Sequence, residues 1–123
     1  MTKRDIKFRA RINSSNEYED VLKIDFILGK VMLYARGWFD FDDVELEQYT
    51  GLKDVNDVEV YEGDIITCTK GCPHKVVWVE AHGGTFFGGM PGWYLSGLDY
   101  GYAWTGQEEV VGNVHMNPEL LEV

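Results

Sequence analysis

The sequence has no long apolar run; Phe26-Ile27-Leu28, for example, is stopped at once by Gly29-Lys30. A helix that crosses a bilayer needs about 20 consecutive apolar residues. The N-terminal residues Met-Thr-Lys-Arg-Asp lead directly into alternating apolar and charged residues, without the apolar stretch of a secretory signal peptide. We therefore expect no membrane association and a cytoplasmic location.

Basic residues are scarce and unevenly placed. The chain has 11 Lys and Arg against 21 Asp and Glu, a formal net charge of −10, and no Lys or Arg follows Lys75. Five of the basic residues lie in the first eleven positions, whereas residues 40–64 hold ten acids and one base, Lys53. A duplex-binding surface needs several cations, so nucleic-acid binding is disfavoured outside the N-terminal strand. The acidity favours solubility; the alternative is an acidic face for a basic partner or a mimic of DNA charge.

Cysteine is limited to Cys68 and Cys72, followed by His74 and His82. Structural zinc sites show two ligand pairs of defined spacing, whereas a whole predicted strand separates the two His residues here. We predict no metal at these four residues and, in a reducing compartment, no disulfide. The pattern instead predicts a three-residue hairpin loop with Gly71 in the left-handed conformation.

Catalytic motifs are missing as well. There is no Gly-x-Ser-x-Gly, and the glycine pairs at 83–84 and 88–89 lack the Lys and the helix of a phosphate-binding loop. Acids are plentiful, but 21 of them in 123 residues bring carboxylates together by chance. We predict no enzyme and no cofactor, and an enzyme that uses clustered acids is the weakest of three function classes.

What the sequence does contain is alternation of apolar and polar residues, which predicts β-strands. The first strand has Ile6, Phe8, Ala10 and Ile12 on one face and three basic residues on the other. The other predicted strands cover residues 21–28, 31–34, 58–60, 65–68, 75–79, 85–87 and 110–114. Residues 38–47 fit either a strand or a short helix capped by Asp42-Asp43.

Turn residues complete this prediction. Gly29-Lys30 predicts a tight turn between two strands. Gly63 or Asp64 is predicted at a sharp bend before Ile65, because Gly tolerates a positive φ and an Asp side chain accepts backbone N–H groups. Asn117-Pro118-Glu119 predicts the start of a helix of about one or two turns. About seven to nine short strands favour one mainly β domain, a barrel or sandwich, over residues 1–123, with a possible N-terminal β subdomain at 1–45 and a barrel at 46–123.

Residues 83–106 combine eight glycines with seven aromatic residues and contain no Lys or Arg. Three interpretations remain open: packing of the aromatics into the core, a protein interface, or stacking on nucleic acid or another ligand. The candidate interface residues are Trp93, Tyr94, Tyr100, Tyr102 and Trp104.

Several short blocks occur in a fixed order along the chain. They are Ile6-Lys7-Phe8-Arg9-Ala10, Gln48-Tyr49-Thr50-Gly51-Leu52-Lys53-Asp54, Tyr61-Glu62-Gly63-Asp64-Ile65, Val110-Val111-Gly112-Asn113-Val114 and Asn117-Pro118-Glu119-Leu120-Leu121. This order resembles the YopX family of small phage and prophage proteins over nearly the full length of the chain. One departure is Asn56-Asp57, where the family usually has Gly in the turn, although Asn and Asp also tolerate the left-handed region.

The resemblance implies an SH3-like small β-barrel for the central and C-terminal part, with additional N-terminal strands and the short C-terminal helix. It implies structural roles for the motif residues, which are Gln48, Tyr49, Thr50, Gly51, Leu52, Tyr61, Glu62, Gly63, Asp64, Gly112, Asn113, Asn117 and Pro118. It implies no activity, because none is established for the family. We expect a non-enzymatic binding or accessory module in the cytoplasm of a bacterial host. A protein partner or self-association is favoured; the alternative is a nucleic-acid-binding barrel in phage replication or regulation that uses the basic N-terminal strand.

Overall fold

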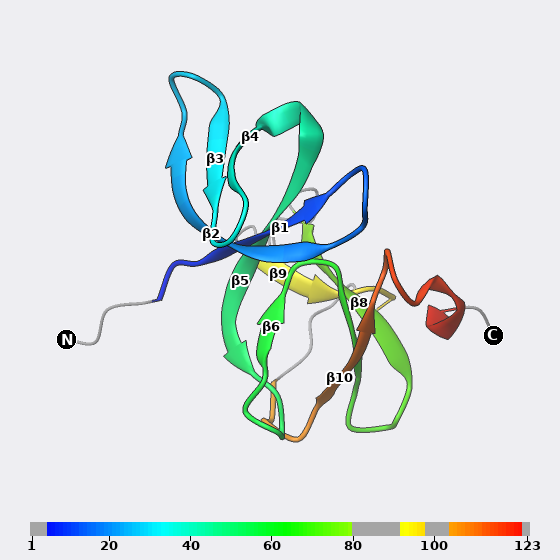
Figure 1. The fold of residues 1–123 in the computed structure, drawn as a ribbon. Helices are drawn as coiled ribbons and strands as arrows, with labels where there is room; N and C mark the ends of the chain where they lie inside the picture. Colours follow the sequence, from blue (N-terminus) through cyan, green and yellow to red (C-terminus); the bar gives the residue numbers. More distant parts are fainter. Residues whose placement is uncertain (1–4, 80–91, 98–103, 122–123) are drawn as a thin grey trace. The chain divides into compact units, whose positions relative to one another are not determined.

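The computed structural model describes residues 5–79, 92–97 and 104–121. Within them the chain is mainly β, with ten strands and two short 3₁₀ turns (Figure 1). The chain divides into two compact units, residues 1–49 and 50–123, which are described separately below. The predicted subdomain boundary at residue 45 lies close to this division.

The first unit is built from one antiparallel sheet in the order β4-β3-β2-β1-β5. Its strands are β1 (Phe8–Ile12), β2 (Tyr18–Asp25), β3 (Lys30–Leu33), β4 (Gly37–Asp40) and β5 (Val44–Lys53), with the 3₁₀ turn η1 (Phe41–Asp43) before β5. Because β1 lies between β2 and β5, both of its edges are paired. Strand β5 continues into the second unit, where β6 (Glu59–Tyr61) is its neighbour.

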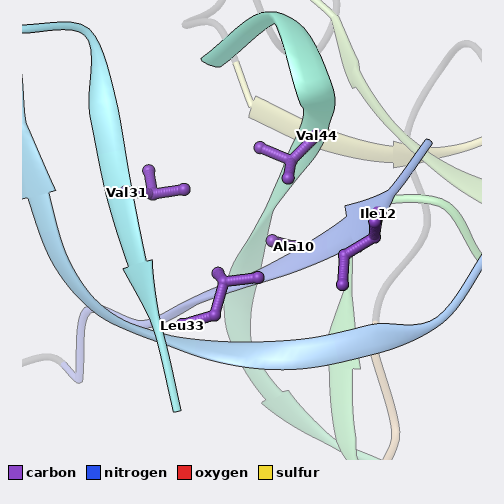
Figure 2. Packing of buried hydrophobic residues seen from close by; sticks show 5 residues of the cluster. All are labelled: Ala10, Ile12, Val31, Leu33 and Val44. Atoms are coloured by element: carbon purple, nitrogen blue, oxygen red, sulfur yellow. The ribbon is translucent and has the colours of Figure 1, made fainter. Parts of the chain in front are cut away.

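The core of the first unit follows from the alternation along these strands. Side chains two residues apart share a face of a strand. Two such side chains from β1 and two from β3 therefore pack against the first residue of β5. Figure 2 shows the five buried side chains, which are Ala10, Ile12, Val31, Leu33 and Val44. The predicted inward face of the first strand is confirmed for Ala10 and Ile12, whereas Ile6 is exposed.

Two segments of the first unit differ from the prediction. Strand β2 ends at Asp25, and residues 26–29 form the turn to β3, so the turn begins three residues earlier than expected. The helix considered for residues 42–48 is absent, because η1 is a single 3₁₀ turn and β5 begins at Val44. The backbone groups of residues 44–48 are paired with β1 instead of forming helical hydrogen bonds.

The second unit contains an antiparallel sheet in the order β10-β7-β8-β9. Its strands are β7 (Asp64–Thr67), β8 (Pro73–Val79), β9 (Gly92–Leu95) and β10 (Glu109–Asn113), and η2 (Pro118–Leu121) follows. A second core joins this sheet to β6. Its buried residues are Val60, Ile66, Cys68, Val76 and Leu95, with Trp93, Trp104 and Val110 packed against them.

Among the described residues the strands of the second unit do not close into a barrel, since β10 and β9 are the two edges of its sheet. The SH3-like barrel is therefore not confirmed. The expected C-terminal helix is also not confirmed, because Pro118–Leu121 forms a 3₁₀ turn of four residues. The strand predicted at residues 85–87 lies outside the described residues. In the part of the chain that is described, no helix is long and apolar enough to cross a membrane.

Candidate functional site

Three of the five candidate interface aromatics lie within the described residues: Trp93 and Trp104 pack against the second core, and Tyr94 is buried. Tyr94 is buried on β9, and its neighbour Trp93 packs edge-on against Trp78, with ring centroids 4.9 Å apart. Trp104 is half-buried and donates its indole N–H to the carbonyl of Lys53 at 3.1 Å. Tyr100 and Tyr102 lie outside the described residues.

These aromatics also line a small apolar pocket of about 60 Å³. Its walls are Thr50, Leu52, Val60, Val76, Trp93, Tyr94, Leu95 and Trp104. A space of this size holds a few water molecules and is well below the roughly 300 Å³ at which small-molecule sites begin. Trp93, Tyr94 and Trp104 therefore act first as core residues, and their role in an interface stays a prediction.

Three strongly exposed apolar side chains follow one another on a turn that the sequence analysis placed inside a strand. Phe26, Ile27 and Leu28 are 80%, 94% and 67% exposed. Trp38 on β4 is 50% exposed and lines a shallow hollow together with Leu28. We call these four side chains the hairpin-tip surface; its turn is the loop between β2 and β3 in Figure 1. Single exposed apolar residues are normal, whereas a contiguous set marks a contact surface.

The turn that carries this surface is fixed by hydrogen bonds. Asp25 ends β2, and its Oδ1 accepts the N–H groups of Ile27 at 3.0 Å and Leu28 at 2.9 Å. Gly29 donates its N–H to the carbonyl of Asp25 at 2.9 Å and has a φ of 67°, in the left-handed region that Gly adopts easily. The Phe26 ring lies edge-on to Phe41 at 6.3 Å. The apolar side chains are thus presented on an ordered turn.

The sequence contained a signal for this surface, because the three successive apolar residues Phe26-Ile27-Leu28 break the alternation expected of a half-buried strand. Strand propensity favoured extending β2 through the run. The competing signal was Asp25, whose short carboxylate caps the N–H groups two and three residues later and so starts a turn.

The basic residues of β1 are paired with carboxylates on the adjacent strand. Arg9 and Arg11 stand directly opposite Glu47 and Glu45, with N–O distances of 2.7 Å and 2.9 Å. The Arg9 guanidinium also lies 4.7 Å from the centre of the Tyr18 ring. Arg11 is 8% exposed. The expected basic outer face is therefore largely neutralised and partly buried, which leaves little charge for phosphates.

Cys68 and Cys72 lie at the two ends of the loop between β7 and β8, as predicted, with Gly71 at a φ of 82°. Cys68 is buried, Cys72 is exposed, and both are free thiols. His74 is half-buried on β8, and His82 lies outside the described residues.

The central family motif forms the bend that the sequence predicts. Gly63 has a φ of 86°, and β7 begins at the next residue, Asp64. The buried Asp64 accepts the N–H of Tyr61 at 2.8 Å through Oδ2. Upstream on β5, the Thr50 hydroxyl donates to the carbonyl of Val60 at 2.8 Å. These contacts fix the chain between β5 and β7.

The C-terminal motif works through close approach of backbone and side chain. A Cβ at Gly112 would lie 2.5 Å from Oδ1 of Asn117, so only glycine leaves room for that side chain. Asn113 accepts the N–H groups of His115 and Met116 through its own Oδ1, at 3.1 Å and 2.9 Å. The motif residues in this part of the chain hold a turn together.

The family model of the YopX protein matches residues 7–122. The chain therefore belongs to the YopX family. Among solved structures, the chain is similar to the crystal structure of protein EF1440 from Enterococcus faecalis, with 21% identity, a TM-score of 0.72, and coverage of 98% of this chain and 100% of that one. At this identity the similarity shows a shared fold alone. No match to a curated protein was found.

Proposed function

We propose that this YopX-family chain is a non-enzymatic accessory module that binds another protein through the hairpin-tip surface. The observation that supports this most directly is the exposure of Phe26, Ile27 and Leu28 on one ordered turn. A cytoplasmic location in a bacterial host, as expected from the sequence, is part of the proposal.

The order of the turn bears on affinity. A binding segment that must first be fixed loses part of its interaction free energy to conformational entropy. The Asp25 hydrogen bonds to Ile27 and Leu28 reduce that cost before the partner arrives. A side chain as exposed as Ile27 gains most of its possible burial on binding, and a buried anchor contributes about 2 kcal/mol or more.

The charge around the surface indicates the chemistry of the partner. Asp40, Asp42 and Asp43 lie at the end of β4 and in η1, and the N–H of Phe41 in the same segment bonds the carbonyl of Gly29 at 2.9 Å. Of these three acids, Asp40 pairs with Lys30 at 3.2 Å. An apolar cleft rimmed by Lys or Arg would complement this surface, with the charges raising the association rate more than the affinity.

The nucleic-acid alternative receives less support. It needs the cations of β1, and both Arg9 and Arg11 are in cross-strand ion pairs. A phosphate would have to displace a carboxylate from each of them, in a chain with a net charge of −10.

The test compares Ile27→Ser with Leu22→Ser, which removes an apolar side chain that is 52% exposed on β2 and outside the hairpin-tip surface. Proteins captured from host-cell extract are identified and purified, and their affinity for each variant is measured by calorimetry. We expect Ile27→Ser to weaken binding about tenfold or more and Leu22→Ser to leave it unchanged.

Two further measurements distinguish other occupants of the surface. Sedimentation of the chain alone shows whether a second copy covers it, in which case Ile27→Ser dissociates the oligomer. Sedimentation with lipid vesicles tests a membrane contact. Vesicle binding that depends on Ile27, or equal effects of the two variants on protein binding, would contradict the proposal.

A further inference from the structure

The loop between β7 and β8 brings two thiols and an imidazole to one face of a hairpin. The pairing register places Ile66 opposite His74 and Thr67 opposite Pro73, so the next pair along the ladder is Cys68 and Cys72. A hydrogen bond of 3.0 Å from the N–H of Cys68 to the carbonyl of Cys72 closes that pair. Residues two apart on a strand share a face, so Cys68 is directly opposite Cys72 and diagonal to His74.

Three groups lie close enough to the Cys68 thiol to favour its ionised form. They are the backbone N–H groups of Lys70 and Cys72 and the side chain of His74. The His74 ring is oriented by a third group, because its Nδ1 lies 2.7 Å from the carbonyl oxygen of Ser96. A carbonyl oxygen only accepts hydrogen bonds, so Nδ1 carries a proton. In the neutral ring Nε2 is then the nitrogen that can accept the proton of the Cys68 thiol.

Ser96 is itself fixed to β8. Its N–H donates to the carbonyl of Lys75 at 2.9 Å, and its hydroxyl accepts the N–H of Lys75 at 3.1 Å. The arrangement of a thiol, an imidazole within reach of it, and a fixed group that orients the imidazole is the one that activates cysteine nucleophiles.

The electrostatic consequence is a more acidic thiol. Burial raises the pKa of Cys68. The N–H groups of Lys70 and Cys72 and the side chain and charge of His74 lower it by a larger amount, so the pKa falls to about 7. An ordinary cysteine has a pKa of about 8.5. Near neutral pH a substantial share of Cys68 is thus the thiolate, the reactive form.

We propose that Cys68 is a peroxide-reactive thiol and that Cys72 resolves its oxidised form by closing a cross-strand disulfide over the β7–β8 loop. The co-reactant is hydrogen peroxide or a small organic hydroperoxide. Cys68 is buried at 9% exposure, so the site selects small oxidants, whereas the exposed Cys72 stands at the open end of the hairpin.

The steps balance with that oxidant. The Cys68 thiolate attacks one peroxide oxygen and the O–O bond breaks, which leaves Cys68 as a sulfenic acid. Hydrogen peroxide releases hydroxide, which takes up a proton to form water, and an organic hydroperoxide releases an alkoxide, which takes up a proton to form the alcohol. The Cys72 sulfur then attacks the Cys68 sulfur, the S–O bond breaks, and water forms. The two thiols together lose two electrons and two protons, and the peroxide is reduced.

The backbone geometry suits the product. Directly opposed residues in a hydrogen-bonded antiparallel pair have Cα atoms about 5.5 Å apart, and disulfides span about 4.4–6.8 Å. The loop that the bond closes has three residues between the cysteines, so the entropy it removes from the unfolded chain is small. The disulfide would form and be reduced readily, so the oxidation of Cys68 and Cys72 would be reversible.

The experiment treats the purified, chelator-treated full chain with hydrogen peroxide and reads the products by intact mass and peptide mapping. Wild type is expected to lose two hydrogens in a Cys68–Cys72 peptide, reversibly with dithiothreitol. In Cys72→Ser, dimedone is expected to trap a sulfenic acid at Cys68. In Cys68→Ser, oxidation of Cys72 is expected to be slow.

The pH profile of alkylation separates activation by His74 from a structural role. With Cys72→Ser as background, iodoacetamide should modify Cys68 with a midpoint near pH 7. At pH 7 the rate should be roughly three- to fourfold above that of an unperturbed thiol, because the larger thiolate fraction is partly offset by the lower nucleophilicity of a more acidic thiol. His74→Gln should move the midpoint toward about 8.5 while the fold, followed by circular dichroism, is kept. The other titratable groups on this hairpin are Asp64, which is buried at the start of β7 and accepts the N–H of Tyr61, and the exposed Lys70 and Lys75.

Three results would overturn the proposal. The first is that both thiols survive peroxide at neutral pH. The second is dimedone capture at Cys72 in the presence of an unmodified Cys68. The third is one equivalent of zinc that blocks both thiols and binds again after the chelator is removed, which would assign the same groups to a metal. If Cys68→Ser fails to fold, dimedone trapping and alkylation of Cys68 in Cys72→Ser still test the proposal, because Cys72 is exposed and its replacement should leave the fold intact.

Discussion

The carboxylate of Asp54 binds the backbone N–H of Val110 at 2.9 Å, 56 residues further along the chain. Its other oxygen accepts the N–H groups of Asn56 at 2.8 Å and Val58 at 2.9 Å. Asp54 is 6% exposed. One side chain therefore closes the turn before β6 and fixes β10 to it, and this explains physically why an Asp ends the first central motif.

Replacing Asp54 by Asn should destabilise the second unit. The amide keeps the size of the side chain but has one acceptor oxygen in place of two, so at least one buried N–H loses its partner. Hydrogen bonds to charged groups contribute about 1.5–3 kcal/mol, and we expect a loss of that order in the free energy of unfolding. Urea titration measures it, with exposed Asp57→Asn as the control, and equal stability of the two variants would contradict the prediction.

The same carboxylate should make stability depend on pH. Burial raises the pKa of Asp54. The hydrogen bonds from the N–H groups of Val110, Val58 and Asn56 lower it by a larger amount, so the folded-state pKa lies below the ordinary value. Its contribution is then complete above the unfolded pKa of about 3.9 and is lost as the pH falls through the folded pKa. The difference between wild type and Asp54→Asn should be largest at neutral pH and shrink below about pH 4. A difference that stays constant across urea titrations at these pH values would refute it.

Gly112→Ala should destabilise the C-terminal turn. The new methyl group would lie 2.5 Å from Oδ1 and 2.9 Å from Cβ of Asn117, so that side chain must move and give up its contact with the N–H of Asn113. Overpacking of this kind costs about 1–3 kcal/mol. Thermal unfolding tests this, with Val111→Ala as the neighbouring control. Adding Asn117→Gly should recover part of the loss, because it removes the clashing group.

Trp93→Ala and Trp104→Ala should each lower stability more than Trp78→Ala, whose side chain is 44% exposed. Both residues pack against the second core, and truncation of a large aromatic there costs about 3 kcal/mol or more. The experiment combines denaturant unfolding with sedimentation. If stability is kept and association is lost, the two residues belong to an interface, as the sequence suggested.

Random duplex DNA should bind weakly at physiological salt. The net charge is −10, and Arg9 and Arg11 are in ion pairs. Even with all five basic residues of the N-terminal segment available, only about 3–5 phosphate contacts could form, for which log affinity falls with log salt at a slope of about −0.9 per contact. Fluorescence anisotropy over a salt series measures this. Sub-micromolar affinity at physiological salt would show that the paired cations are available after all.

Local features of the chain were decided by the sequence itself. The bend at Gly63-Asp64, the left-handed Asp57 and the Cys68–Cys72 hairpin loop each depend on a few neighbouring residues and their allowed φ angles, and all three are present in the structure. The alternation in β1 correctly placed Ala10 and Ile12 in a core. Motif order also predicted the family, since it spans nearly the whole chain.

Tertiary structure decided what depends on partners far apart in sequence. Whether Arg9 faces solvent or Glu47 is settled by β5 pairing with β1, and whether Trp104 packs in a core or lies free is settled by β6 and β8. Alternation gives a strand two faces but does not say what covers either of them. The turn at Phe26 is the remaining case. One capping carboxylate, that of Asp25, ended β2 before the apolar run Phe26-Ile27-Leu28, so a segment whose sequence predicts a strand is an exposed turn. The local hydrogen bonds and the length of β3 together outweighed its strand propensity.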